Sequence, residues 1–344
     1  MKKLIKIIAV ILPLLLAASF ILLHNTVDTP VNSTSDTVMK VHYIDVGQGD
    51  SVLIESNGSY MLIDAGKANK SETIINYLKY IGVKKLDYVI WTHPDADHIG
   101  GAADVIESFS IGKVIMPGKT HTTDTFENLL SAIKKKGLKI TRPEFGNKYT
   151  VGMSSFTIIA PNKEYEDNNN SSAGLKLVNG DTSFLFIGDA EKEAIDDIMA
   201  NGLDLKADVL MAGHHGSDTS TTKEFLNAVD PDSAVISVGK DNSYGHPADT
   251  TLKLFRDNKI KLYRTDENGT IVASSNGKTV TFTATAYDFK SSANTDGSIV
   301  YITETGKKYH VADCPYLSQG KIKTTLKEAK DEGLSPCSKC NPPE

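Results

Sequence analysis

A short segment near position 95 carries four side chains that can bind metal ions. It reads Thr-His-Pro-Asp-Ala-Asp-His-Ile-Gly-Gly, and the four are His93, Asp95, Asp97 and His98. Imidazole and carboxylate donors suit Zn²⁺, and Mn²⁺ also accepts the oxygen donors well. A solvated polar loop with a capping aspartate is the alternative, but it does not account for so dense a cluster. The segment therefore predicts a centre for divalent metal ions.

Three further polar groups each follow an apolar run elsewhere in the chain. Asp64 ends Leu-Ile-Asp, Asp189 ends Phe-Ile-Gly-Asp, and the pair His214-His215 follows Val-Leu-Met-Ala-Gly. Carboxylates directly after buried strands are costly unless they are paired or bind a metal. We expect Asp189 to bind metal and Asp64 to orient the histidine loop. One of the two adjacent histidines is expected to be a ligand and the other to meet substrate.

The elements that must position these motifs are short strands and intervening helices. Period-2 patterns predict strands at 41–46, 51–55 and 60–64, and a buried strand at 87–92 runs straight into His93. Later strands are expected near 113–116, 155–159, 183–187, 208–211, 233–237, 261–265, 270–274 and 279–284. Helices are expected near 71–80, 125–136, 190–201, 222–229 and 248–257. Polar motifs at strand ends in such a series indicate a layered α/β sandwich.

Composition limits the classes of function. The net charge is −6, so no global positive field attracts nucleic acid. A DNA substrate would need metal ions and local basic side chains to offset its phosphate charge. All three cysteines lie at or after position 314, so the main body is not a disulfide scaffold.

The N-terminus has the form of a signal peptide or a membrane anchor over residues 1–23. Three lysines precede an apolar run from Ile7 to Leu23, which is short for a spanning helix and long for a cleaved signal. We favour an uncleaved anchor slightly. Residues 24–38 are polar and read as a linker. Either form of the segment places the rest of the chain on the extracellular face of the cytoplasmic membrane or in the medium.

A small separate module is expected at the C-terminus, at 298–344, after a main domain at 39–285 and a linker at 286–297. Four of its residues form a set typical of a tetrahedral zinc site, namely His310, Cys314, Cys337 and Cys340. A module of this size has little core, so a structural zinc ion would stabilise it. The alternative, one disulfide with a spare thiol, leaves the histidine unexplained.

The module has two further features. Thr325 and Glu328 predict a capping box at the start of a helix that Gly333 ends. Residues 299–343 resemble the small Ada-like metal-binding tail found on bacterial secreted nucleases, which favours a nucleic-acid context. Its lysines either contact phosphates or form an ordinary solvated face.

The motifs of the main domain, taken in order, resemble the metallo-β-lactamase superfamily. The finer resemblance is to the extracellular domain of the DNA-uptake channel protein ComEC and its stand-alone relatives. It is carried by His42-Tyr-Ile-Asp-Val-Gly-Gln-Gly-Asp-Ser51, Leu62-Ile-Asp-Ala-Gly66, His93-Pro-Asp-Ala-Asp-His-Ile-Gly-Gly101, Gly188-Asp-Ala-Glu191, Gly213-His-His-Gly-Ser217 and Asn242-Ser-Tyr-Gly-His-Pro247. The resemblance implies a four-layer αββα sandwich and metal-dependent hydrolysis.

The chain departs from the broad superfamily at two places. Asp95 stands where the common loop has a histidine, and the histidine usual before the Asp189 motif is absent. Asn169, Asn170 and Ser172 lie there instead. One metal site is therefore expected to be richer in oxygen donors, and we expect Asn170 and Ser172 to support the ligands. The channel segments of ComEC are missing, so the chain is not the pore.

The resemblance also implies a ligand assignment for two divalent ions, Zn²⁺ or Mn²⁺. One ion would take His93 and Asp95, and Asp189 would bridge. The second ion would take Asp97, His98 and either His215 or His214. Such a pair of ions activates water and stabilises the charge on a phosphoryl group.

Several side chains are expected to act on substrate. Asp97 and His246 are the candidate catalytic groups, with His246 as general acid or phosphate donor. Ser217 and Asn242 are candidate phosphate contacts. Asp50, in the turn Gly-Gln-Gly-Asp, is expected near the site at the tip of a hairpin.

The sequence is compatible with three functions. The first is a phosphodiesterase or nuclease acting on extracellular DNA, with components of the competence machinery as partners. The second is a cell-wall phosphodiesterase such as a phosphorylcholine or teichoic-acid esterase, which the lack of choline-binding aromatic repeats disfavours. The third is a non-catalytic DNA-binding protein, which the dense ligand loop disfavours. Hydrolysis of β-lactams is not expected, because the ligand set resembles that of phosphodiesterases.

Overall fold

The computed structural model describes residues 38–287, 299–303, 306–311, 314, 317, 321–340 and 342. The predicted export segment and most of both predicted linkers lie outside these described residues. Among the residues that are described, no helix has the length and apolar character needed to cross a bilayer.

The first sheet of the main part has eight strands in the order β15-β14-β1-β2-β3-β4-β5-β6. In chain order they are β1 (Met39–Tyr43), β2 (Val52–Ser56), β3 (Ser59–Ile63), β4 (Lys85–Ile90), β5 (Ser110–Ile115), β6 (Ile140–Thr141), β14 (Ile271–Ser275) and β15 (Val280–Phe282). β1, β2 and β3 form an antiparallel meander, whereas β3 to β6 run parallel. The carboxyl ends of β3 and β4 therefore lie at one edge of this sheet.

The second sheet has seven strands in the order β13-β12-β11-β10-β9-β8-β7. They are β7 (Lys148–Val151), β8 (Ser154–Ala160), β9 (Gly174–Asn179), β10 (Thr182–Phe186), β11 (Val209–Met211), β12 (Ser233–Ile236) and β13 (Lys261–Arg264). β10 to β13 run parallel, so the loops that follow β10, β11 and β12 share an edge.

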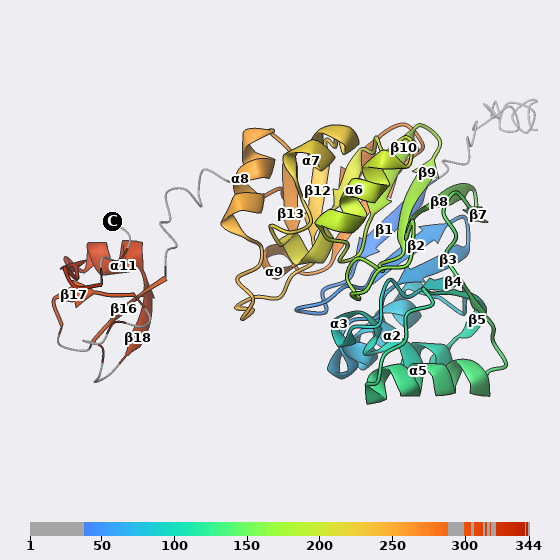
Figure 1. The fold of residues 1–344 in the computed structure, drawn as a ribbon, viewed down its shortest axis with the longest axis horizontal. Helices are drawn as coiled ribbons and strands as arrows, with labels where there is room; N and C mark the ends of the chain where they lie inside the picture. The colour runs from blue at the N-terminus through green and yellow to red at the C-terminus, as the bar shows by residue number, and fades with distance from the viewer. Residues whose placement is uncertain are drawn as a thin grey trace, which may run out of the picture. The chain divides into compact units, whose positions relative to one another are not determined.

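Alternation along the strands builds three apolar layers. Tyr43, Ile54 and Phe184 point into a core between the two sheets. Leu53 packs outward against helices of the first half, and Leu185 packs outward against helices of the second half. Figure 1 shows α2 and α5 on one side of the sandwich and α6 and α7 on the other. The expected four-layer αββα sandwich is confirmed.

The helices agree with the predicted segments to within two residues. The predicted ones are α2 (Ser71–Ile81), α5 (Asp124–Lys135), α6 (Lys192–Ala200), α7 (Lys223–Val229) and α8 (Asp249–Asp257). The shorter ones are η1 (Ala68–Lys70), α3 (Ala96–Ile99), α4 (Ala102–Ser108), η2 (Gly213–Gly216) and α9 (Thr265–Asn268).

The C-terminal part has its own small core. It contains β16 (Ile299–Ile302), β17 (Lys308–Tyr309), β18 (Ile322–Thr325), α11 (Leu326–Asp331) and β19 (Ser335–Pro336). β16 pairs with β18, and β17 pairs with β19. The capping box of Thr325 and Glu328 is confirmed, and it fixes the first turn of α11. Val300 and Leu326 pack in the core of this part.

Candidate metal centre

The side chains predicted to bind metal converge from loops at the ends of parallel strands. His93 follows β4, and α3 carries Asp97 and His98. Asp189 follows β10, and His215 lies in η2 after β11. β4 belongs to the first sheet and β10 and β11 to the second, so the centre draws on both sheets.

Four donors form the tightest group, which we call the Asp50 group: Asp50, His98, Asp189 and His215. Their ligand atoms all lie within 4.8 Å of one another, and all four residues are buried. Nε2 of His98 is 3.2 Å from Oδ2 of Asp189. Nδ1 of His215 is 3.2 Å from Oδ1 of Asp50. Two imidazoles and two carboxylates in this arrangement suit a divalent ion.

A second, sparser set lies on the other side of Asp189. Nε2 of His93 is 3.7 Å from Oδ2 of Asp95 and 3.9 Å from Oδ2 of Asp189. We call His93 and Asp95 the His93 pair. The Asp95 side chain is 36% exposed, and its Oδ1 accepts a hydrogen bond of 2.7 Å from Asn168. This half of the centre has fewer donors than the Asp50 group.

Asp97 lies beside the Asp50 group. Its Oδ2 is 3.6 Å from Nε2 of His215, and the side chain is 22% exposed. Burial raises the pKa of Asp97, but the close imidazole of His215 and the nearby charge of His98 outweigh it and hold the pKa well below its usual range. Asp97 is therefore an ionised carboxylate that can bind a cation.

The residues fit the metal ions that the sequence predicts. Three imidazole nitrogens, Nε2 of His93, His98 and His215, are buried with no hydrogen-bond partner, and so is Oδ1 of Asp189. Buried polar atoms without partners are rare in folded proteins and are costly. Divalent ions coordinated by these atoms would satisfy all of them.

Electrostatic interactions in the centre are strong. Burial and the neighbouring His98 lower the pKa of His93 to about 3. Burial lowers the pKa of His215 as well, but Asp189 and Asp50 outweigh it and raise that pKa to about 10. Burial raises the pKa of Asp189, yet His98 and His215 hold it well below its ordinary value. The carboxylates are thus ionised and available to a cation.

Asp64 holds His98 in place. Its Oδ2 accepts hydrogen bonds of 2.8 Å from Nδ1 of His98 and 2.6 Å from Oγ1 of Thr92. Its Oδ1 accepts a 2.8 Å bond from the Thr92 backbone nitrogen. Because Nδ1 of His98 is used in this way, Nε2 of the same ring is left to bind metal. This geometry agrees with the orienting role expected of Asp64.

Asn170 and Ser172 support the loop that carries Asp189. Ser172 Oγ accepts a 3.1 Å hydrogen bond from the Asp189 backbone nitrogen and lies 3.4 Å from Nδ1 of His93. Asn170 Oδ1 accepts bonds of 3.1 Å and 3.0 Å from the backbone nitrogens of Glu191 and Ala194, at the start of α6. These two residues occupy the region where the superfamily commonly has a further histidine.

His214 and His215 have different surroundings. Both have positive φ angles, 49° and 54°, which turn their side chains in different directions. His215 is buried, and its Nδ1 lies 3.1 Å from the Ser237 carbonyl oxygen. His214 is partly exposed, with Nδ1 3.3 Å from Oε1 of Glu191. The geometry favours His215 as the ligand in the Asp50 group, while Nε2 of the more exposed His214 lies 3.7 Å from Oδ2 of Asp189.

The loop after β12 places His246 next to these rings. The His246 ring lies 5.4 Å from that of His214, and its Nδ1 is buried without a partner. Asn242 holds the loop: its Nδ2 donates to the carbonyl oxygens of Gly239 and His246, and its Oδ1 accepts from the backbone nitrogens of Tyr244 and His246. The Asn242 amide is therefore occupied within the loop.

Ser217 is likewise engaged within its own turn. Its Oγ lies 3.0 Å from Oγ1 of Thr219 and accepts a 3.3 Å bond from the Thr219 backbone nitrogen. Contact of Ser217 or Asn242 with a phosphate stays a prediction, and the structure gives both side chains local partners.

Asp50 is a ligand candidate that the sequence predicted only to lie near the site. Its backbone nitrogen donates a 3.2 Å bond to the Asp97 carbonyl oxygen. The preceding Gly49 has φ of +140°, and a Cβ there would lie 2.4 Å from that same oxygen. The Gly-Gln-Gly-Asp motif could have indicated this close approach, since a glycine is needed where two backbones come so near to each other.

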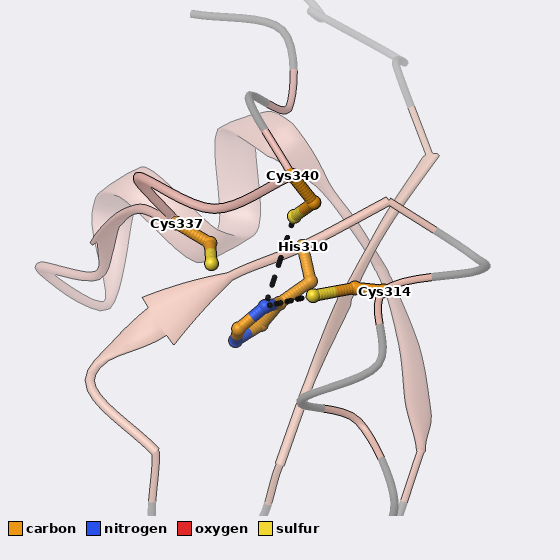
Figure 2. A group of neighbouring side chains, drawn as sticks. All are labelled: His310, Cys314, Cys337 and Cys340. Atoms are coloured by element: carbon orange, nitrogen blue, oxygen red, sulfur yellow. Dashed lines mark hydrogen bonds between the residues drawn. The ribbon is translucent and has the colours of Figure 1, made fainter.

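A second cluster lies in the C-terminal part and consists of His310, Cys314, Cys337 and Cys340. Its four donor atoms lie within 4.8 Å of one another, and Figure 2 shows the side chains pointing toward a common centre. Nδ1 of His310 is 3.2 Å from Sγ of Cys314 and 3.9 Å from Sγ of Cys340. All three cysteines are free thiols. This donor set matches the tetrahedral zinc site expected from the sequence.

Comparisons with known proteins agree with this geometry. A family model described as "Metallo-beta-lactamase superfamily" matches residues 44–240. ComE operon protein 3 of Bacillus subtilis is 34% identical over 251 residues, covering 67% of this chain and 32% of that protein. Competence protein ComA of Neisseria gonorrhoeae is 31% identical over 253 residues, covering 70% of this chain and 32% of that protein.

The chain spans about a third of the length of these curated relatives. Among solved structures, the metallo-beta-lactamase fold protein YhfI of Bacillus subtilis has a TM-score of 0.48 at 13% identity, covering 71% of this chain and 99% of that one.

Proposed function

Because this chain belongs to the metallo-β-lactamase superfamily and is homologous to competence proteins, we propose that it is a metal-dependent phosphodiesterase that cleaves extracellular DNA. The observation that carries the proposal is the set of buried imidazole nitrogens without partners around Asp189. Those of His98 and His215 belong to a group that also contains a second buried carboxylate, Asp50. A purely structural loop would not keep such atoms unsatisfied.

The Asp50 group would hold one divalent ion, and the His93 pair with Asp189 would hold a second. Such ions supply Lewis acidity toward a phosphoryl group and lower the pKa of water. Asp97, ionised and partly exposed, is placed to bind a cation at the surface of the site. Asp64 keeps the His98 ring in the orientation this requires.

We propose that His246 contacts the substrate. Burial and the charges of His214 and His215 lower its pKa, so the ring is neutral near pH 7. A neutral imidazole has one N–H, which can donate a hydrogen bond to a phosphate oxygen. This state favours the phosphate-donor role over that of a protonated general acid.

We also propose that the C-terminal cluster holds a structural zinc ion and that residues 298–344 form a separate module. In our proposal the protein acts on the extracellular face of the cytoplasmic membrane or in the medium, tethered or exported by residues 1–23. Nucleic acid is the proposed substrate, and components of the competence machinery are the proposed partners.

The test is metal analysis of the full chain together with a substrate panel. We expect hydrolysis of single-stranded or double-stranded DNA in Zn²⁺ or Mn²⁺ and no hydrolysis in a chelator. Asp97→Asn should abolish turnover while circular dichroism and thermal unfolding stay unchanged. Asp104→Asn, at an exposed position on α4, is the matched control and should behave as wild type.

Two results would contradict the proposal. Preferential hydrolysis of a teichoic-acid analogue would favour the cell-wall esterase. DNA binding without metal-dependent turnover of any phosphodiester would favour the non-catalytic alternative.

A further inference from the structure

A continuous series of aromatic rings runs from the metal centre to the protein surface. The ring centroids of His93 and His98 are 4.1 Å apart, and those of His98 and His215 are 5.2 Å apart. His246 follows at 6.5 Å from His215, and Tyr244 follows at 5.9 Å from His246. The first three rings are the candidate ligands, so Tyr244 lies two ring contacts away from a candidate ligand.

Tyr244 is exposed at the outer end of this series of rings. Its side chain is 62% exposed, although its ring stacks on His246 with an angle of 27° between the planes. One face of the ring thus packs on the imidazole. Because the ring is large, exposed and next to the metal centre, a ligand bound at that centre can pack on it.

The loop holds Tyr244 in this position before any ligand arrives. The Asn242 side chain accepts a 3.1 Å hydrogen bond from the Tyr244 backbone nitrogen and another of 3.1 Å from the His246 backbone nitrogen. Gly245, between the two rings, has φ of +75°, a conformation that lets the chain turn back on itself. Such preorganisation reduces the entropy lost when a ligand stacks on the ring.

We propose that Tyr244 is a stacking platform for a nucleobase adjacent to the scissile phosphate, and that the substrate is therefore an unpaired nucleic-acid strand. This inference rests on the proposed function and specifies its substrate. In a duplex both faces of an interior base are covered by its neighbours, whereas an unpaired base can stack on an aromatic side chain. The stacked histidine behind Tyr244 provides a flat and rigid support.

The same ring could in principle bind the trimethylammonium group of phosphorylcholine. Recognition of quaternary ammonium groups uses a cage of several aromatic rings around the cation. Tyr244 instead stacks on an imidazole and offers a flat surface. The geometry therefore favours a planar base over choline.

The experiment measures binding rather than turnover, using fluorescence anisotropy of labelled strands with the full chain. All proteins carry Asp97→Asn to prevent cleavage. The probes are a single-stranded oligonucleotide, an abasic strand of the same length and charge, and the corresponding duplex. The variants are Tyr244→Leu, Tyr244→Phe and Tyr244→Trp. Tyr80→Leu is the matched control, because Tyr80 is 85% exposed on α2.

We expect the parent protein to prefer the base-bearing single strand to the other two probes. Tyr244→Leu should weaken binding of that strand by about 5- to 150-fold, the size of one base–aromatic stack, and leave the abasic strand unaffected. Tyr244→Phe and Tyr244→Trp should keep the affinity, and Tyr80→Leu should change nothing.

Equal losses on base-bearing and abasic strands would overturn the inference, because they would indicate a structural role for Tyr244. Tighter binding of the duplex than of the single strand would also overturn it. So would a Tyr244→Leu variant that binds the base-bearing strand as before and loses only the ability of glycerophosphocholine to compete with it. Turnover by the wild-type chain tests the proposed function separately, so a failure of either claim can be recognised.

Discussion

The two halves of the metal centre differ in how completely the fold supplies donors. The Asp50 group has four buried residues with ligand atoms within 4.8 Å of one another. The His93 pair has one buried imidazole and one carboxylate, Asp95, whose side chain is 36% exposed. Asp189 lies next to an imidazole of both halves, His93 in one and His98 in the other.

The cause of the difference lies in the segment before β9. Asn168 binds Asp95, Asn170 caps α6, and Ser172 bonds to the backbone of Asp189. These side chains organise the loops around the metal centre but offer no imidazole. We therefore expect the Asp50 group to bind its ion more tightly than the His93 pair, whose affinity should be sensitive to small changes around Asp95.

The largest expected effect comes from the residue that both halves share. Asp189→Asn keeps the shape of the side chain but removes its charge, so we expect both ions to be lost and turnover to fall by about 10³-fold or more. Metal content and kcat/KM measure this. Retention of one full equivalent of active-site metal would mean that the halves do not depend on Asp189 together.

A matched pair of substitutions tests the expected difference in metal affinity between the two halves. Asp50→Asn should lower the affinity of the stronger site by about 100-fold, whereas Asp95→Asn should lower that of the weaker site by about 10-fold. Titration with a competing chelator gives both dissociation constants. The comparison fails if the two substitutions have equal effects, or if Asp95→Asn is the more damaging.

The effect expected from Asp64, the residue that holds His98, is no larger than that of Asp95→Asn. Asp64→Asn keeps an acceptor for Thr92 but weakens the charge-assisted bond to Nδ1 of His98, so metal affinity should fall by about 10-fold at the Asp50 group alone. The His93 pair should be unaffected in the same titration. An equal loss at both sites would show that Asp64 acts on the whole loop.

Much of this centre was predictable from local sequence. His93, Asp189 and the His214-His215 pair each follow an apolar strand, and strand ends in a parallel sheet meet at one edge. Which of the two adjacent histidines faces inward was not predictable. That choice depends on two consecutive positive φ angles, which no propensity specifies for histidine.

The contacts that the sequence did not predict depend on tertiary approach or on loop conformation. Asp50 joins its group because Gly49 allows the first hairpin to approach Asp97, which is far along the chain. Asn242 was expected at a phosphate, but the four hydrogen bonds of its amide depend on a loop conformation that its sequence does not reveal. β9 was not predicted either, because Lys176 and Asn179 interrupt its apolar pattern and only sheet pairing on both sides defines it.

Ligands from both sheets meet at Asp189. Asp50 and His98 come from loops of the first sheet, whereas Asp189 and His215 come from loops of the second. A coordinated ion would therefore act as a reversible cross-link across the seam of the sandwich, in a body that has no cysteine with which to form a covalent one. Since any ligand of the native state adds its binding free energy to folding, the availability of metal would set how firmly the two halves of the sandwich are joined.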